Sequence, residues 1–256
     1  MKTFYLYLDE SGDFEKDKDY RDNPSLVGGL LSADKPIPDN LALEILGAQY
    51  IHSCEIPFNE YGSFAVEKLQ KVVDLGLSLV IFENKDRLEV VDGDTTYLNV
   101  IAEGIIQLLQ LLQAEYRDIH LDITVAVRKA INREDYKNRY IINKAEYNKR
   151  LQEKIIIGLA RKSITSIGKA NWTLDLETAR EDHRLMLADI VCHTWFRKDQ
   201  KFTEAEKKIV TGMYKEKFVF RMFSSESELR YQRMILDGNI GDVIYEIYTN
   251  DGKQSS

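Results

Sequence analysis

Residues 4–13 read FYLYLDESGD, and this stretch joins a strand-forming run to a cluster of carboxylates. Residues 4–8 are all aromatic or leucine, which predicts a strand buried on both faces. Asp9, Glu10 and Asp13 follow at once. Carboxylates at the end of a buried strand are costly unless a positive charge lies beside them. The stretch is therefore either a turn that happens to be acidic or one half of a functional site.

Five strands are predicted from this stretch outward, and helices separate most of them. The strands are expected at residues 4–8, 25–32, 77–83, 119–127 and 171–178, and the helices at 40–49, 63–74, 97–115, 136–162 and 183–198. This order predicts an α/β fold, an open mixed sheet with helices on both faces. Sites in such sheets lie at the carboxyl ends of the strands, so Asp9 is expected at the mouth of a site.

The chain is long enough for one well-packed domain. We expect a core at residues 1–198 with a helical insert at about 36–75. Residues 199–256 are expected to form a C-terminal extension packed on or beside this core. The composition, 44% hydrophobic and 30% charged, is ordinary for a soluble globular protein.

The sequence predicts a cytoplasmic protein with no membrane partner. No apolar stretch approaches the roughly 18 residues that span a bilayer, and Asp9 and Glu10 interrupt any signal peptide. The two cysteines, Cys54 and Cys192, fit no disulfide framework and no metal-ligand spacing.

Charge is distributed unevenly along the chain. Residues 128–162 hold 11 Lys/Arg against 4 Asp/Glu, although the whole chain has a net charge of −7. A basic segment on an acidic body is typical of a surface that faces phosphates, but a solvated helix with exposed lysines has the same composition. Nucleic acid therefore stays open as a partner.

Asp189 lies on the apolar face of the predicted helix at 183–198. Leu185, Cys192 and Phe196 share its side at helical spacing. An unpaired carboxylate there would cost several kcal/mol. It must pair with a cation, cap backbone groups or coordinate a metal. Together with Asp9, the third option predicts a Mg²⁺ or Mn²⁺ site with oxygen ligands.

Four motifs in order resemble family 3800 of the domains of unknown function, a DESGD-type family. They are YLDESGD at 7–13, SLVGG at 25–29, IHSCE at 51–55 and LMLADIV at 185–191. The resemblance covers roughly residues 4–198. It implies a ribonuclease H-like fold, which the predicted strand order matches independently, a divalent-metal site of acidic residues and phosphodiester hydrolysis.

The resemblance assigns Asp9 as the first-strand aspartate and Asp189 as the last-helix aspartate. Glu10 belongs to the same motif, but side chains alternate along a strand, so it is expected to point to the opposite face. Glu10 is a candidate catalytic residue that either binds the metal or is a loop carboxylate outside the metal's ligand set. Ser11 and Asp13 are candidates for supporting the ligands.

A ribonuclease H-like fold usually supplies two further acids. Asp122, in the fourth strand, is a candidate catalytic residue and metal ligand, although it lies early in that strand. Glu103, in the preceding helix, is a candidate supporting residue, although its neighbours Gln107 and Gln110 indicate a solvated polar face. The alternatives of a one-metal site and a degenerate site therefore stay open.

The inserted segment carries two further candidates. His52 is a candidate general acid or base, because its ordinary pKa lies near neutrality. Glu55 is a candidate supporting residue. Both alternatively hold the insert against the core, and His193 is interpreted as a helix-packing histidine.

The sequence thus predicts a metal-dependent nuclease of low sequence specificity. Contacts to the nucleic-acid backbone are expected from five basic residues: Arg128, Lys129, Arg133, Lys137 and Arg139. The alternative is a catalytically degenerate module on the same fold that binds nucleic acid or protein. A haloacid dehalogenase-like phosphatase would use Asp9 as nucleophile, but its second aspartate is replaced by Ser11. A protein partner and a homo-oligomer stay open.

Overall fold

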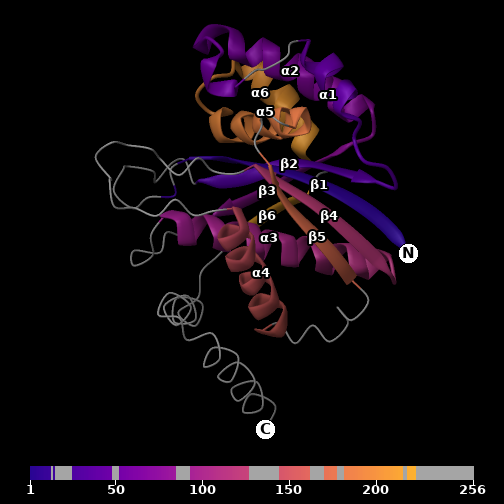
Figure 1. The fold of residues 1–256 in the computed structure, drawn as a ribbon. Coiled ribbons are helices and arrows are strands. Elements are labelled where there is room, and N and C mark those ends of the chain that lie inside the picture. Colours follow the sequence, from indigo (N-terminus) through magenta and orange to yellow (C-terminus); the bar gives the residue numbers. More distant parts are fainter. Residues whose placement is uncertain are drawn as a thin grey trace.

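The computed structural model describes residues 1–12, 14, 25–47, 52–84, 93–126, 144–161, 170–177, 182–215 and 218–222. Within these ranges the chain forms an α/β fold with a mixed sheet between two layers of helices (Figure 1). The strands are β1 (Lys2–Ser11), β2 (Leu26–Ala33), β3 (Ser78–Asn84), β4 (Ile119–Ala126), β5 (Ala170–Glu177) and β6 (Phe218–Met222). The helices are α1 (Asp39–Leu46), the short 3-10 helix η1 (Ser53–Glu55), α2 (Phe58–Asp74), α3 (Gly93–Glu115), α4 (Lys144–Arg161), α5 (His183–Arg197) and α6 (Glu204–Lys215).

The strands that the structure describes follow the order β5-β4-β1-β2-β3-β6. β2 is antiparallel to both β1 and β3, whereas β1, β4 and β5 run parallel to one another. The carboxyl ends of β1, β4 and β5 therefore meet at one edge of the sheet. The predicted mixed α/β sheet with helices on both faces is confirmed.

The predicted sheet of five strands was one strand short. β6 pairs with β3 in parallel and adds an edge strand to the described sheet. It comes from the segment expected as a C-terminal extension, where local sequence does not show which strand it joins. The same segment supplies α6, which packs against α2 (Figure 1).

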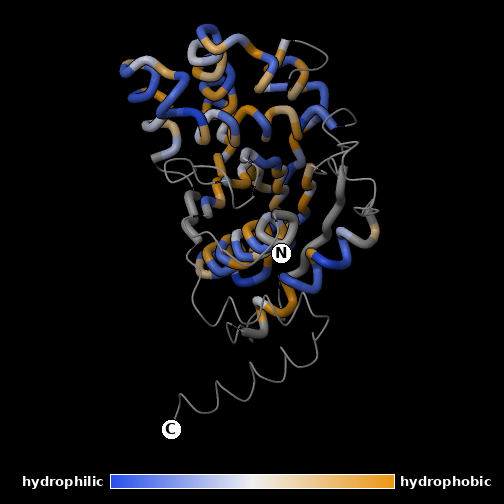
Figure 2. Tube along the Cα trace, turned by 90° about the vertical axis from the view of Figure 1, so that its left-hand side faces the viewer, coloured by the Kyte–Doolittle hydropathy of each residue, from blue (hydrophilic) through white to orange (hydrophobic). Residues whose placement is uncertain are grey.

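Two hydrophobic cores lie on the two faces of the sheet. Phe4, Leu6 and Leu8 of β1 join the core beneath α3 and α4, whereas Tyr7 joins the core beneath α1, α2, α5 and α6. Figure 2 shows the hydrophobic residues concentrated in the middle of the molecule. Because side chains alternate along a strand, this register directs Asp9 to the same face as Tyr7, towards α5.

Two glycines of β2 let α5 and β1 approach closely. A Cβ on Gly29 would lie 1.7 Å from the carbonyl oxygen of Tyr7. A Cβ on Gly28, which is paired with Asp9, would lie 3.4 Å from the Cα of Cys192 in α5. All residues of α5 from Leu185 to Phe196 are buried, as expected for a helix that is enclosed on every side.

Candidate active site

The end of β1 and the middle of α5 bring two aspartates together. Asp9 lies near the end of β1 on the face that α5 covers, and Asp189 is a buried residue of α5. The pKa of Asp9 is raised well above its ordinary value, first by burial and then by the charges of Glu10 and Asp189. The charge of Asp189 thus acts on Asp9, and the prediction that the two aspartates are the halves of one metal site stays a prediction.

Glu10 lies between the two helical layers at the same strand end. Its backbone N–H donates to Oδ1 of Asp9 at 2.8 Å, and the hydroxyl of Tyr97 in α3 donates to its Oε2 at 3.4 Å. The contact with α3 agrees with the expectation that Glu10 points away from α5. Its carboxyl group nevertheless stays close to that of Asp9, because a side-chain hydrogen bond between them also raises the pKa of Asp9.

Asp189 is held by the insert between β2 and β3. Its Oδ2 accepts a hydrogen bond from the backbone N–H of Ser53 at 2.8 Å and lies 3.8 Å from Nδ1 of His52. Burial raises the pKa of Asp189, although the Ser53 N–H and His52 act in the opposite direction. Of the three options for this buried carboxylate, the bond to a backbone group is therefore observed.

His52 caps η1 and faces Asp189. Its Nδ1 accepts from the backbone N–H of Cys54 at 3.3 Å, so the neutral ring carries its proton on Nε2. The His52 side chain is about half exposed, at 47%. Glu55 is exposed, and its negative charge raises the pKa of Asp189 further. The sequence suggested His52 and Glu55 as candidates near the acids, but it did not predict the hydrogen bond between η1 and Asp189.

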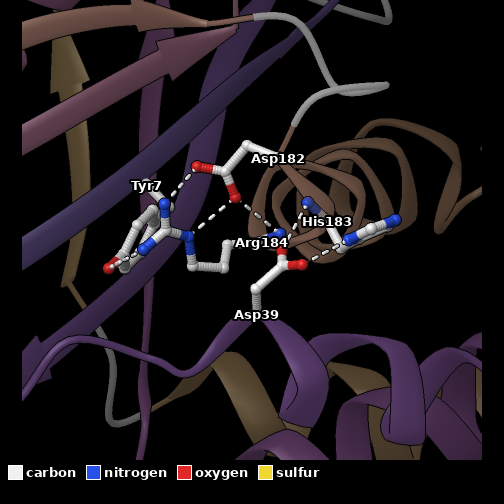
Figure 3. A network of polar contacts seen from close by, with 5 residues as sticks. All are labelled: Tyr7, Asp39, Asp182, His183 and Arg184. Carbon is white, nitrogen blue, oxygen red and sulfur yellow. Dashed lines mark hydrogen bonds and ion pairs between the residues drawn. The ribbon is translucent and has the colours of Figure 1, made fainter.

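A polar network at the start of α5 holds this helix in position (Figure 3). Asp182 accepts from the backbone N–H of Arg184 at 2.9 Å and binds its guanidinium group. Arg184 lies over the ring of Tyr7, 4.8 Å from its centroid. Asp39 of α1 accepts from the backbone N–H of His183 at 2.9 Å and contacts its Nδ1 at 2.6 Å. The network therefore ties α5 to β1 and α1, which fixes where Asp189 lies.

Asp122 was predicted as a catalytic residue and metal ligand, and the register of β4 contradicts this placement. Asp122 pairs with Tyr5, four residues before Asp9 on the parallel strand β1. At about 3.3 Å per residue, it lies roughly 13 Å along the strand from Asp9. The position beside the end of β1 belongs instead to Ala126, whose carbonyl oxygen accepts from Tyr97 at 3.2 Å.

Glu103 does not join the cluster either. It belongs to α3, on the face of the sheet opposite to α5 (Figure 1). Its Oε1 accepts from Nε2 of Gln107 at 3.2 Å, and the side chain is partly buried rather than fully solvated. A supporting role next to Asp189 is therefore not compatible with its position.

The remaining predicted residues divide into two groups. Ser11 is buried and its hydroxyl lowers the pKa of the Cys192 thiol, so it lies at the contact between β1 and α5. His193 is buried and packs edge-on against Tyr61, as predicted, with ring centroids 5.0 Å apart. Outside the described residues lie Asp13, Arg128, Lys129, Arg133, Lys137 and Arg139.

Two residues near the acids were missed by sequence reasoning. Tyr97 was counted only as the start of a helix, and Lys201 follows α5 in a segment without a motif. Tyr97 is recognised as a neighbour of the acids only when it is known that Glu10 points to the face of β1 that α3 covers. Nothing local distinguishes Lys201 from the other lysines of the chain.

The acidic residues at this strand end offer carboxylate oxygens. The described residues place no Lys or Arg within ion-pair distance of Asp9, so its charge has no protein counter-ion there. Asp9, Glu10 and the second oxygen of Asp189 are the donors that Mg²⁺ and Mn²⁺ prefer. Within the described ranges, no group of three or more His, Cys, Asp or Glu residues is placed so that it could hold a metal ion. Mg²⁺ commonly binds one or two carboxylates and keeps several waters, so the donor set fits that ion.

Comparison of the chain with protein-family models found no match, and a search of curated proteins found none at the threshold used. In the part of the chain that the structure describes, no helix has the length and apolar character needed to cross a membrane.

Proposed function

We propose that this chain is a divalent-metal-dependent nuclease that hydrolyses phosphodiester bonds in RNA or DNA. The sheet order, with β1 between antiparallel β2 and parallel β4, supports a ribonuclease H-like fold. The four ordered motifs that resemble family 3800 support the same assignment.

The convergence of Asp9, Glu10 and Asp189 carries this proposal. Asp9 and Glu10 come from a strand end, and Asp189 comes from a buried helix. Burial and the charges of Glu10 and Asp189 raise the pKa of Asp9. Such mutual repulsion destabilises the folded protein unless a cation binds. An arrangement that costs stability in the metal-free protein is expected where metal binding serves a function.

Asp9 and Asp189 would hold one Mg²⁺ or Mn²⁺, with Glu10 at its edge. When bound, such an ion activates water and stabilises negative charge on a phosphate. The Ser53 N–H orients the Asp189 carboxylate through its bond to Oδ2. His52, with its proton on Nε2 when neutral, is placed next to Asp189 to exchange a proton with a water or a leaving oxygen.

The first experiment is thermal unfolding in EDTA, Mg²⁺ and Mn²⁺ for the wild type and for Asp9→Asn. A metal at one hundred times its Kd stabilises the native state by about 2.7 kcal/mol, which raises the Tm by roughly 5–11 °C for a chain of this size. Asp9→Asn should lose this rise. Asp74→Asn is the matched control, because Asp74 is an exposed aspartate of α2 that accepts from Gln70. It should keep the full rise.

Hydrolysis of RNA and DNA strands would then be measured with the metal that stabilises the protein. A wild-type Tm that does not respond to either metal would sink the nuclease proposal. A catalytically degenerate binding module on the same fold would then be the better interpretation. The positions of Asp122 and Glu103 away from the cluster favour this alternative.

A further inference from the structure

Two basic residues at the end of α5 lack a carboxylate partner within the described residues. Nζ of Lys201 lies 3.2 Å from Nε2 of His193 and 4.7 Å from the ring centroid of Tyr61. Arg197 donates from a terminal nitrogen to Gln200 at 2.6 Å, and its Nε is buried without a hydrogen-bond partner. Lys201 therefore keeps donors that an anion could use, whereas Arg197 contributes its charge, because its Nε is enclosed.

Two neighbouring lysines, in contrast, are paired with a carboxylate. Nζ of Lys207 lies 2.5 Å from Asp199, and Nζ of Lys198 lies 3.4 Å from the same carboxylate. A carboxylate is thus within reach of this turn, yet it neutralises Lys198 and Lys207 rather than Lys201 or Arg197.

The environment of Lys201 favours an additional anion. Burial, and then the charges of Lys201 and Arg197, lower the pKa of His193 to about 3, so its ring is neutral and its Nε2 accepts from Lys201. Burial and the charge of Arg197 also lower the pKa of Lys201 itself. A bound anion would relieve the repulsion between the two cations, because it attracts both.

This basic pair lies further along the chain from Asp189: Arg197 follows it by eight residues at the end of α5, and Lys201 contacts His193. His193, which binds Lys201, follows Asp189 by one helical turn, a rise of about 6 Å. The thiol of Cys54 is affected by both groups: Asp189 raises its pKa and Lys201 lowers it, after the larger effect of burial. The charge of His52 likewise lowers the pKa of both Asp189 and His193.

We propose that Lys201 and Arg197 bind a backbone phosphate next to the one that is hydrolysed, which makes a polynucleotide strand the substrate. The inference rests on the proposed function, since the metal site defines the hydrolysed phosphate. An ester with a single phosphate could occupy the metal site, but it could not also reach Arg197, about two turns further along α5, and Lys201, which follows the helix. A strand presents successive phosphates and can contact both.

Strand binding is tested first without metal, so that the result is independent of catalysis. Fluorescence anisotropy in EDTA would follow binding of labelled single strands of thymidine or uridine, about 15 nucleotides long, over a range of salt concentrations. Lys201→Met keeps the aliphatic stem on Tyr61 and removes the charge. It should weaken binding by about tenfold and lower the salt slope by about 0.7. Lys201→Arg should retain the slope, and so should Lys207→Met, the control whose lysine is already paired with Asp199.

Hydrolysis then separates the two proposals. Lys201→Met should raise the KM for an oligonucleotide more than the KM for bis(4-nitrophenyl) phosphate, because this small diester has no neighbouring phosphate. An unchanged salt slope in Lys201→Met, with a Tm that shows intact folding, overturns the inference even if the metal response of Asp9 is found. A reduced slope in a protein that hydrolyses neither substrate supports strand binding and contradicts the nuclease proposal.

Discussion

Two substitutions at Asp189 separate the effect of its charge from the effect of its hydrogen bond. Oδ2 of Asp189 accepts from the backbone N–H of Ser53, and Ser53 is fully buried, so no water can replace this acceptor. Asp189→Ala therefore leaves a buried donor unsatisfied, which costs about 1–3 kcal/mol. For a chain of this size, the Tm should fall by roughly 2–12 °C in EDTA.

Asp189→Asn keeps an oxygen acceptor for Ser53 and removes the charge. Because burial raises the pKa of Asp189, the ionised form is destabilising in the metal-free protein. The Tm of Asp189→Asn in EDTA at pH 7.5 should therefore equal or exceed that of the wild type. Both variants should lose the rise with Mg²⁺ or Mn²⁺.

Differential scanning calorimetry of the wild type and the two variants, with and without metal, measures these differences. If Asp189→Asn lost as much stability in EDTA as Asp189→Ala, the negative charge itself would hold η1 in place, through His52 at 3.8 Å. Asp189 would then be a structural ion pair. A preserved metal response in Asp189→Asn would refute its assignment as a ligand.

Two further predictions test the packing and the acidic cluster. Gly29→Ala should destabilise the folded protein by about 4 kcal/mol or more, because its Cβ would overlap the carbonyl of Tyr7. Gly212→Ala, in open space on α6, should stabilise it by about 0.5–1 kcal/mol. Urea unfolding measures the sign of both changes. The raised pKa of Asp9 means that the folded protein binds more protons than the unfolded chain, so stability in EDTA should fall as pH rises from the ordinary value of 3.8 through the folded pKa. Unfolding midpoints measured from pH 5 to 8 should show this fall, and it should be smaller in saturating Mg²⁺ and in Asp9→Asn.

Local patterns predicted most elements and both aspartates. The alternating apolar residues of β4, the apolar run before Asp9 and the helical spacing around Asp189 depend only on neighbours within a few positions. Asp122 was misplaced because its role depends on register, which is set by pairing between strands far apart in sequence. β6 was not counted for the same reason.

The sequence by itself determined that a carboxylate would end the first strand and that another would project from the buried face of a late helix, since burial makes any unpaired charge expensive. The tertiary structure decided which carboxylates share one place. β1 lies in the centre of the sheet, Gly28 faces α5 and Gly29 faces the backbone of β1, and η1 supplies the backbone N–H that orients Asp189. It also left Lys201 without a carboxylate partner in the described residues, since ion pairing depends on which side chains meet in space and not on their order in the chain.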